Sequence, residues 1–190
     1  YVQIIKYFSS LNDVDIKVAN EDGENALHML CKNNCFQLVK HFVSLNKIEI
    51  SAKNVKGQNV LHISCEFGNL DLVAYLISLN KIDLFSVDND GQSIIYYAFS
   101  NSEHATPIIK HLISLNKIDF GYKDKKNKSA LFYACEKGNL ELFKLLQKHH
   151  QFDYDDQDIE GKTILHYACS SNNLDLVQYL ISSCNVPATE

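Results

Sequence analysis

The sequence predicts an all-α repeat protein, an α-solenoid in which pairs of short helices alternate with β-hairpin-like loops. A turn residue recurs at intervals of 34, 34, 36 and 34 residues, at Gly23, Gly57, Gly91, Asn127 and Gly161. Each one is followed by the same kind of segment, as in GQNVLHISC from Gly57 to Cys65. The 190 residues therefore divide into about five and a half repeated units, without one central core. We number the complete units one to five and expect them at residues 19–52, 53–86, 87–122, 123–156 and 157–190.

The first helix of each unit is predicted to begin at a polar side chain that accepts hydrogen bonds from the unpaired amides of a helix start. These side chains are Asn25, Asn59, Ser93, Ser129 and Thr163. The helix is expected to end at a residue type that tolerates the left-handed backbone of a helix C-cap. These ends lie near Asn34, Gly68, Gly138 or Asn172.

The second helix is predicted by apolar residues at helical spacing, for example through residues 70–79. Its ends are expected at Asn46, Asn80 and Asn116. An alternating tract such as residues 81–84 follows, a pattern typical of extended chain. Turn dipeptides such as Asp90-Gly91 then form the hairpin that leads into the next unit.

This pattern resembles the ankyrin repeat, whose family line is Asp-x-x-Gly-x-Thr-Pro-Leu-His-x-Ala. The Leu-His pair is intact at residues 27–28, 61–62 and 165–166. The family's Asp position holds Asn20, Asn54, Asp88, Asp124 and Asp158. The tetratricopeptide repeat has the same period, but it lacks the hairpin and the Gly-x-x-x-Leu-His segment. With five units in register, the chain is identified as an ankyrin repeat array over essentially its whole length.

The chain departs from the family pattern in three ways. The family Pro is replaced by Ala26, Val60, Ile94, Ala130 and Ile164, so the helix starts should be looser. The period is one residue longer than the family's usual length of about 33. Two more residues enter unit three around residues 100–107, which predicts a longer loop between its helices.

Residues 1–18 are interpreted as the second helix and linker of a partial unit. Ile4 and Phe8 lie 34 residues before Leu38 and Phe42, which belong to the second helix of unit one. Natural arrays end in polar capping repeats, whereas both ends of this sequence carry apolar helix residues. We therefore expect the sequence to be a fragment of a longer protein.

Composition disfavours several classes of partner. The net charge is −5 and all 18 basic residues are Lys, which argues against nucleic acid. The sequence contains no run of about 18 apolar residues, so we expect no membrane insertion of this segment.

Cysteine recurs in the small-residue position of the first helix, at Cys31, Cys65, Cys135 and Cys169. Equivalent positions a whole repeat apart are too distant for a disulfide, so we expect reduced thiols and an intracellular, cytoplasmic protein.

Histidines and cysteines occur at a spacing typical of metal sites, and we interpret them as structural residues. A His-x-x-Cys sequence occurs at His28, His62 and His166, and the resemblance implies that this His hydrogen-bonds the hairpin backbone. Tyr96 and Phe132 replace it in two units, although a required ligand would not be replaceable, so we expect no metal and no cofactor. The acidic run at residues 153–158 lacks the Gly and Glu spacing of a calcium loop. No catalytic motif is present, which predicts a non-enzymatic protein.

The resemblance implies a protein-binding surface on the concave side, formed by hairpin tips and the exposed face of the first helices. The corresponding residues are Glu21, Asp22, Glu24, Val55, Lys56, Gln58, Glu66, Phe67, Asn89, Asp90, Lys125, Lys126, Lys128, Lys137, Ile159 and Glu160. Three of them are apolar and can anchor a partner. The surface is acidic in unit one and basic in unit four, where the lysines could equally serve only to keep a hairpin soluble.

We therefore expect a protein-protein interaction module, an ankyrin scaffold that binds a protein partner of unknown identity. Two alternatives remain open. The array could be a structural component packed in a stable macromolecular assembly, or a regulatory ankyrin domain of a larger enzyme or channel.

Overall fold

The computed structural model describes residues 18–46, 48–101, 103–184 and 186. Within them the helices form five pairs: α2 (Ala26–Lys32) and α3 (Phe36–Ser44), α4 (Val60–Glu66) and α5 (Leu70–Ser78), α6 (Ile94–Ser100) and α7 (Ala105–Ser114), α8 (Ala130–Glu136) and α9 (Leu140–His149), and α10 (Ile164–Ser170) and α11 (Leu174–Ser183). The prediction of an all-α repeat fold is confirmed. The predicted partial unit at residues 1–18 lies outside the described residues, except for Val18.

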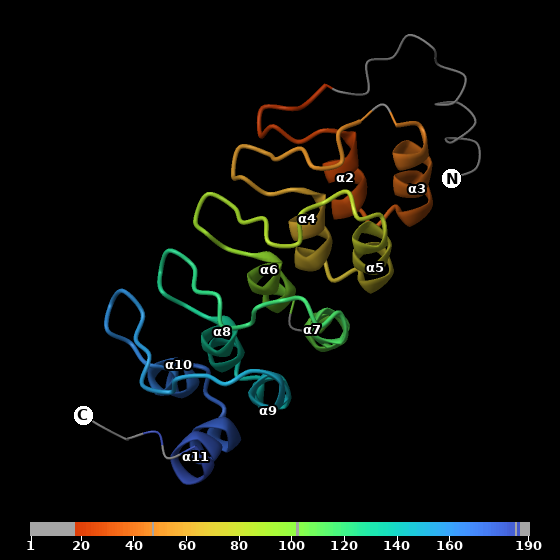
Figure 1. Ribbon diagram of the computed structural model, residues 1–190. Coiled ribbons are helices and arrows are strands. Elements are labelled where there is room, and N and C mark those ends of the chain that lie inside the picture. The colour runs from red at the N-terminus through yellow and green to blue at the C-terminus, as the bar shows by residue number, and fades with distance from the viewer. Residues whose placement is uncertain (1–17, 47, 102, 185, 187–190) are drawn as a thin grey trace.

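The helix pairs stack in chain order (Figure 1). The first helices α2, α4, α6, α8 and α10 form one row, and each packs against the first helix of the next unit. The second helices α3, α5, α7 and α9 form a neighbouring row, and α11 ends the stack. The loops before the first helices project to one side as a third row. We call the hairpin tips and the exposed side of the first helices the hairpin face.

Helix boundaries follow the chemistry of single residues. The Asn59 side chain accepts hydrogen bonds from the amides of Leu61 and His62 at 3.0 and 3.1 Å, and Asn25 caps α2 in the same way. Positive φ values of 52° to 75° occur at the predicted ends of the first helices, at Asn34, Gly68, Gly138 and Asn172. Values of 51° to 55° occur at the predicted ends of second helices, at Asn46, Asn80 and Asn116. These predicted boundaries are confirmed, but the predicted cap is wrong for Ser129, whose side chain makes no capping hydrogen bond at the start of α8.

The hairpins are tight turns without strands in the part of the chain that the structure describes. In unit two, the Gly57 amide donates to the Asn54 carbonyl and the Asn54 amide donates to the Gln58 carbonyl, both at 2.9 Å. The prediction of extended chain at residues 81–84 is wrong. The Asp83 carboxylate accepts a hydrogen bond from the Phe85 amide at 2.9 Å, and this local contact turns the chain.

Unit three is irregular where the sequence predicts it. Its inter-helix loop spans residues 101–104, one residue more than the loop at 67–69. The second additional residue lengthens α7, which has 10 residues where α5 has 9. His104, the residue before α7, makes no side-chain capping bond, whereas Asn69 caps the equivalent α5. This helix start therefore lacks the cap found in the preceding unit.

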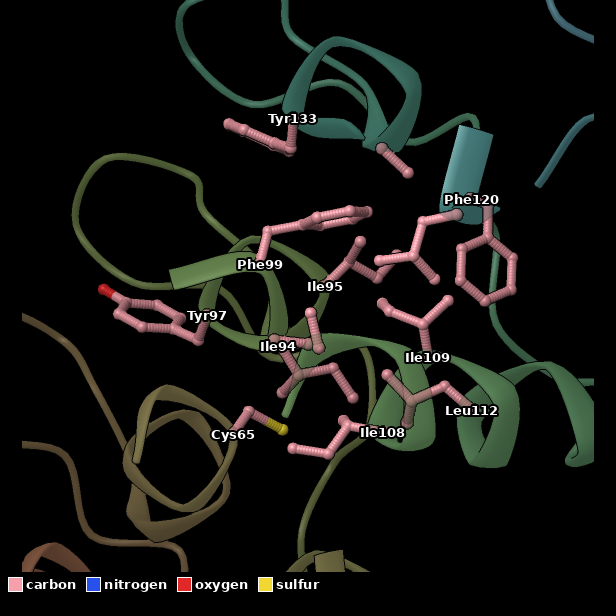
Figure 2. Packing of buried hydrophobic residues seen from close by; sticks show 14 of the residues in the cluster. Cys65, Ile94, Ile95, Tyr97, Phe99, Ile108, Ile109, Leu112, Phe120 and Tyr133 are labelled. Carbon is pink, nitrogen blue, oxygen red and sulfur yellow. The ribbon is translucent and has the colours of Figure 1, made fainter. Parts of the chain in front are cut away.

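Buried apolar side chains form one continuous cluster along the stack. Figure 2 shows its part in unit three, where Ile94 and Ile95 of α6 meet Ile108 and Ile109 of α7. The ring of Tyr97 points away from these aliphatic side chains, with its hydroxyl outermost. Burying each large aliphatic side chain contributes about 1.5–3 kcal/mol, so adjacent units stabilise each other through shared apolar surface.

Three of the four recurring cysteines lie in the interior, and the fourth does not. Cys31, Cys65 and Cys135 are buried, and burial raises the pKa of the Cys31 thiol to about 12. Cys169 is exposed, because among the described residues no further first helix packs against α10. All six cysteines are free thiols.

Candidate protein-interaction surface

Backbone hydrogen bonds join each hairpin tip to the next. The amides of Val55, Asn89, Lys125 and Ile159 donate to carbonyls of the preceding tip at 2.9 to 3.1 Å. Side chains reinforce this row: the Asn89 amide group donates to the Val55 carbonyl at 2.8 Å, and the Lys125 ammonium donates to the Asn89 carbonyl at 2.6 Å. The tips are therefore fixed relative to one another and present a pre-formed surface.

His62 holds its first helix against the loop that leads to the next hairpin. Its Nδ1 accepts a hydrogen bond from the Asn59 amide at 3.1 Å, and its Nε2 lies 3.0 Å from the Ser86 carbonyl. Burial lowers the pKa of His62 to about 4, although the Ser86 carbonyl opposes this shift. The imidazole is thus neutral near pH 7 and holds backbone, as the resemblance implies. Among the described residues, no three His, Cys, Asp or Glu side chains are grouped so that they could hold a metal ion.

In units three to five, an aspartate ties the hairpin to the first helix. One Asp88 carboxylate oxygen accepts hydrogen bonds from the amides of Asp90 and Gln92 at 2.9 and 2.7 Å. The other accepts a hydrogen bond from the Tyr97 hydroxyl at 2.6 Å. We call this arrangement the Asp–Tyr clip. It recurs in the pairs Asp124–Tyr133 and Asp158–Tyr167.

Burial, followed by the aspartate itself, raises the pKa of each clip tyrosine above its ordinary value, so the hydroxyl remains a donor. The clip was not predicted, although the sequence carries a signal for it. A Tyr follows nine residues after the Asp in three units, whereas the two units with Asn carry Met29 and Ile63 at that position.

Charged pairs line the first helices in units one and four. Glu24 pairs with Lys32, eight residues later at the end of α2. Unit four reverses the signs: Lys128 Nζ lies 2.5 Å from Glu136 Oε2 and 4.3 Å from the centre of the Tyr167 ring. The residue that follows the turn thus points beneath its hairpin and reaches the end of its own first helix.

A family comparison agrees with this geometry. The family model described as ankyrin repeats, in three copies, matches residues 1–88, 35–106 and 95–190. The chain belongs to the ankyrin repeat family. Ankyrin repeats are generally protein-protein interaction modules and are typically non-enzymatic. No curated protein matches the sequence. None of the helices in the described residues is long and apolar enough to cross a membrane.

The ankyrin array exposes most of the residues predicted to bind a partner, and it leaves Glu66 half-buried. The exposed residues are Glu21, Asp22, Val55, Lys56, Phe67, Asn89, Asp90, Lys125, Lys126, Lys137, Ile159 and Glu160. The expectation of exposure is wrong for Glu24, Gln58 and Lys128, which are buried. All three follow a turn residue and make their polar contacts inside the array.

The hairpin face of the array has several hollows. A hollow of about 490 Å³ lies between units two and three, and its lining includes Val55, Lys56, Glu66, Asp90 and Tyr96. Another, of about 620 Å³, lies over α10 in unit five. The first hollow contains residues from two consecutive hairpins, so a partner seated there would contact both units.

Proposed function

We propose that this chain is a non-enzymatic protein-binding module, an ankyrin scaffold whose hairpin face holds a segment of a protein partner. The observation that carries the proposal is a set of exposed apolar side chains, two on the fixed row of hairpins and one at the end of a first helix. Val55, Phe67 and Ile159 are 60%, 45% and 69% exposed. Apolar groups on a pre-organised frame bury area on binding with little further ordering, which favours affinity.

The charges of the hairpin face support one binding orientation. Glu21 and Asp22 at one end, and Lys126 and Lys137 toward the other, have no ion-pair partner among the described residues. A partner segment with a basic and an acidic end would be attracted in one direction and repelled in the other. The net charge of −5 and the absence of Arg favour protein over nucleic acid. The free thiols favour an intracellular site of action.

The test is affinity capture with the chain as bait, followed by quantitative mass spectrometry. Phe67→Ala, and separately Lys125→Glu with Lys126→Glu, should each lower recovery of a specific partner about tenfold. Phe85→Ala and Lys148→Glu are matched controls, because both residues are exposed but lie off the hairpin tips. Equal recovery by the hairpin-face variants and the wild type would remove this surface as the binding site.

A further inference from the structure

Glu66 is a carboxylate without a counterion in the interior of the hairpin face. It is the last residue of α4, is half-buried, and has no hydrogen bond or ion pair among the described residues. A negative charge at the C-terminal end of a helix is unfavourable, because the helix dipole is negative there. A nearby cation would stabilise the Glu66 carboxylate, and the described part of the array does not supply one as an ion pair.

The equivalent positions of other units show what is missing. Glu136 ends α8 as Glu66 ends α4, and it pairs with Lys128. In unit two the position of Lys128 is held by Gln58, whose side chain donates to the Tyr97 hydroxyl at 2.9 Å and accepts from Asn54 at 2.7 Å. Gln58 is thus neutral and already engaged, and it leaves the Glu66 carboxylate unpaired.

The charged groups around Glu66 compensate for it only in part. Burial raises the pKa of Glu66 and Glu24 of unit one adds to this effect, while Lys32 and Lys56 oppose it. Lys32 is itself paired with Glu24. The remaining cation, Lys56, is exposed at a hairpin tip. An incoming cation would therefore meet a carboxylate whose charge is still incompletely balanced.

The surroundings of Glu66 fit a basic side chain with apolar neighbours. The hollow of about 490 Å³ has three carboxylates in its lining, from Glu66, Asp88 and Asp90, against the single ammonium of Lys56. The half-buried ring of Tyr96 also lines it, and aromatic faces attract cations. Exposed Val55 borders the hollow, and exposed Phe67 directly follows Glu66 in the chain.

We propose that this hollow receives an arginine or lysine side chain of the protein partner, whose cation pairs with Glu66 while adjacent apolar side chains of the partner contact Val55 and Phe67. This inference rests on the proposed function and names the chemistry of the segment that the hairpin face selects. Arginine binds more tightly than lysine, because its planar guanidinium can meet a carboxylate with two hydrogen bonds and stack on an aromatic ring.

The experiment uses random 12-residue peptides displayed on phage and selected against the chain. We expect the selected peptides to share a basic residue beside apolar ones. The affinity of one fluorescein-labelled peptide is then measured by fluorescence polarisation. Glu66→Gln should weaken binding about tenfold, and so should norleucine in place of the peptide's basic residue. The two changes together should cost no more than either alone, because they remove the same interaction.

Matched variants separate the possible outcomes. Glu136→Gln changes the equivalent residue of unit four, which already has a partner, and should leave peptide affinity unchanged. Glu66→Lys should abolish binding and should restore it for a peptide that carries Glu in place of its basic residue. Thermal unfolding of Glu66→Gln should occur at no lower temperature than that of the wild type, because the variant loses an unfavourable charge and no bond.

Selected peptides without a basic residue, or unchanged affinity in Glu66→Gln, would overturn this inference. If such peptides still lose affinity in Phe67→Ala or in Lys125→Glu with Lys126→Glu, the hairpin face still binds and the proposed function stands. If no selected peptide responds to any of these changes, both proposals fail.

Discussion

Units one and two hold their hairpins differently from units three to five. In the last three units, the Asp–Tyr clip joins the hairpin to the first helix of the same unit. In unit two, Asn54 holds Gln58, and Gln58 reaches Tyr97 of the next unit. The hairpin contact thus stays within the unit in units three to five and crosses to the neighbouring unit in unit two.

The difference shows that the aspartate of a clip and the tyrosine nine residues later depend on each other. A buried carboxylate needs a donor for each oxygen, and two backbone amides bond only one oxygen of Asp124. The Tyr133 hydroxyl supplies the other donor. Asn54 instead carries a donor in place of the second oxygen, so it tolerates the apolar Ile63 on the helix. An Asp opposite Ile or Met would leave an acceptor unpaired at a cost of about 1–3 kcal/mol.

The largest expected effect comes from removing the central residue of a clip. Asp124→Ala leaves the amides of Lys126 and Lys128 and the Tyr133 hydroxyl without their acceptor, so we expect a loss of about 3 kcal/mol in the free energy of unfolding. Asn54→Ala removes two amide contacts and the contact to the Gln58 side chain, but none of them involves a charged group, so it should cost about 2 kcal/mol. Urea unfolding followed by circular dichroism measures both. Equal losses would show that the negative charge of the aspartate adds nothing to the clip.

A second prediction tests how the hairpins pack across the border between the two regions. Gly57 and Gly161 have φ values of 81° and 78°, so alanine at either position carries a similar strain of about 1–2 kcal/mol. A Cβ at Gly57 would also lie 2.8 Å from the Asn89 amide nitrogen of unit three, whereas the nearest atom to one at Gly161 is 3.8 Å away.

Gly57→Ala should therefore lower the free energy of unfolding by about 1 kcal/mol more than Gly161→Ala, because only the former pushes two hairpins apart. Thermal unfolding of the two variants under the same conditions measures the difference. Equal shifts in melting temperature would indicate that the hairpins of units two and three do not rely on close contact.

A third prediction isolates the tyrosine hydroxyl. Tyr133 is 5% exposed, and Tyr133→Phe leaves the second oxygen of Asp124 without its donor, which should cost about 1–2 kcal/mol. Tyr96→Phe is the matched control, because the Tyr96 hydroxyl has no hydrogen bond among the described residues and its ring packs against Tyr97 and Tyr133. Urea unfolding should leave that control within about 0.5 kcal/mol of the wild type. A loss in Tyr96→Phe as large as that in Tyr133→Phe would mean that the cost does not come from the hydrogen bond to Asp124.

The sequence predicts features that depend on one residue and its immediate neighbours. Asn34 and Gly68 end first helices because they adopt positive φ, and Asn25 caps α2 through its own side chain. The burial of Gln58 and Lys128 cannot be predicted from one residue and its immediate neighbours. It depends on what lies beneath the hairpin: the next unit's Tyr97 for Gln58, and Glu136 with the Tyr167 ring for Lys128.

The residues of the candidate site also form two groups, one predictable from the sequence and one that depends on contacts with other side chains. The exposure of Val55 and Ile159 follows from their place at a hairpin tip, which the repeat register defines. The lack of a counterion for Glu66 follows from the side-chain contacts, which differ between units two and four. It could not be predicted from the sequence, where Gln58 has the character of an ordinary polar surface residue. The repeat register predicts the exposure of single positions, whereas these contacts depend on pairs of positions eight or nine residues apart within a unit.

The smallest expected effect concerns the acid dependence of a clip. Burial alone would raise the pKa of Asp158, but hydrogen bonds from the Tyr167 hydroxyl and the amides of Lys162 and Glu160 outweigh it and hold the pKa below the ordinary value. The unfolded chain binds this proton near pH 3.9. Asp158 thus contributes stability above that pH, and the contribution is lost as the pH falls through the lower folded-state pKa.

Stability of the wild type should therefore fall more steeply between pH 5 and pH 3 than that of Asp158→Asn, by no more than about 1 kcal/mol over the range. Asp155→Asn is a suitable control, since Asp155 is exposed in the loop leading to the same hairpin and belongs to no clip. Its profile should parallel that of the wild type. Urea midpoints measured at half-unit pH steps make the comparison, and parallel profiles for all three proteins would mean that the clip in unit five does not depend on its charge.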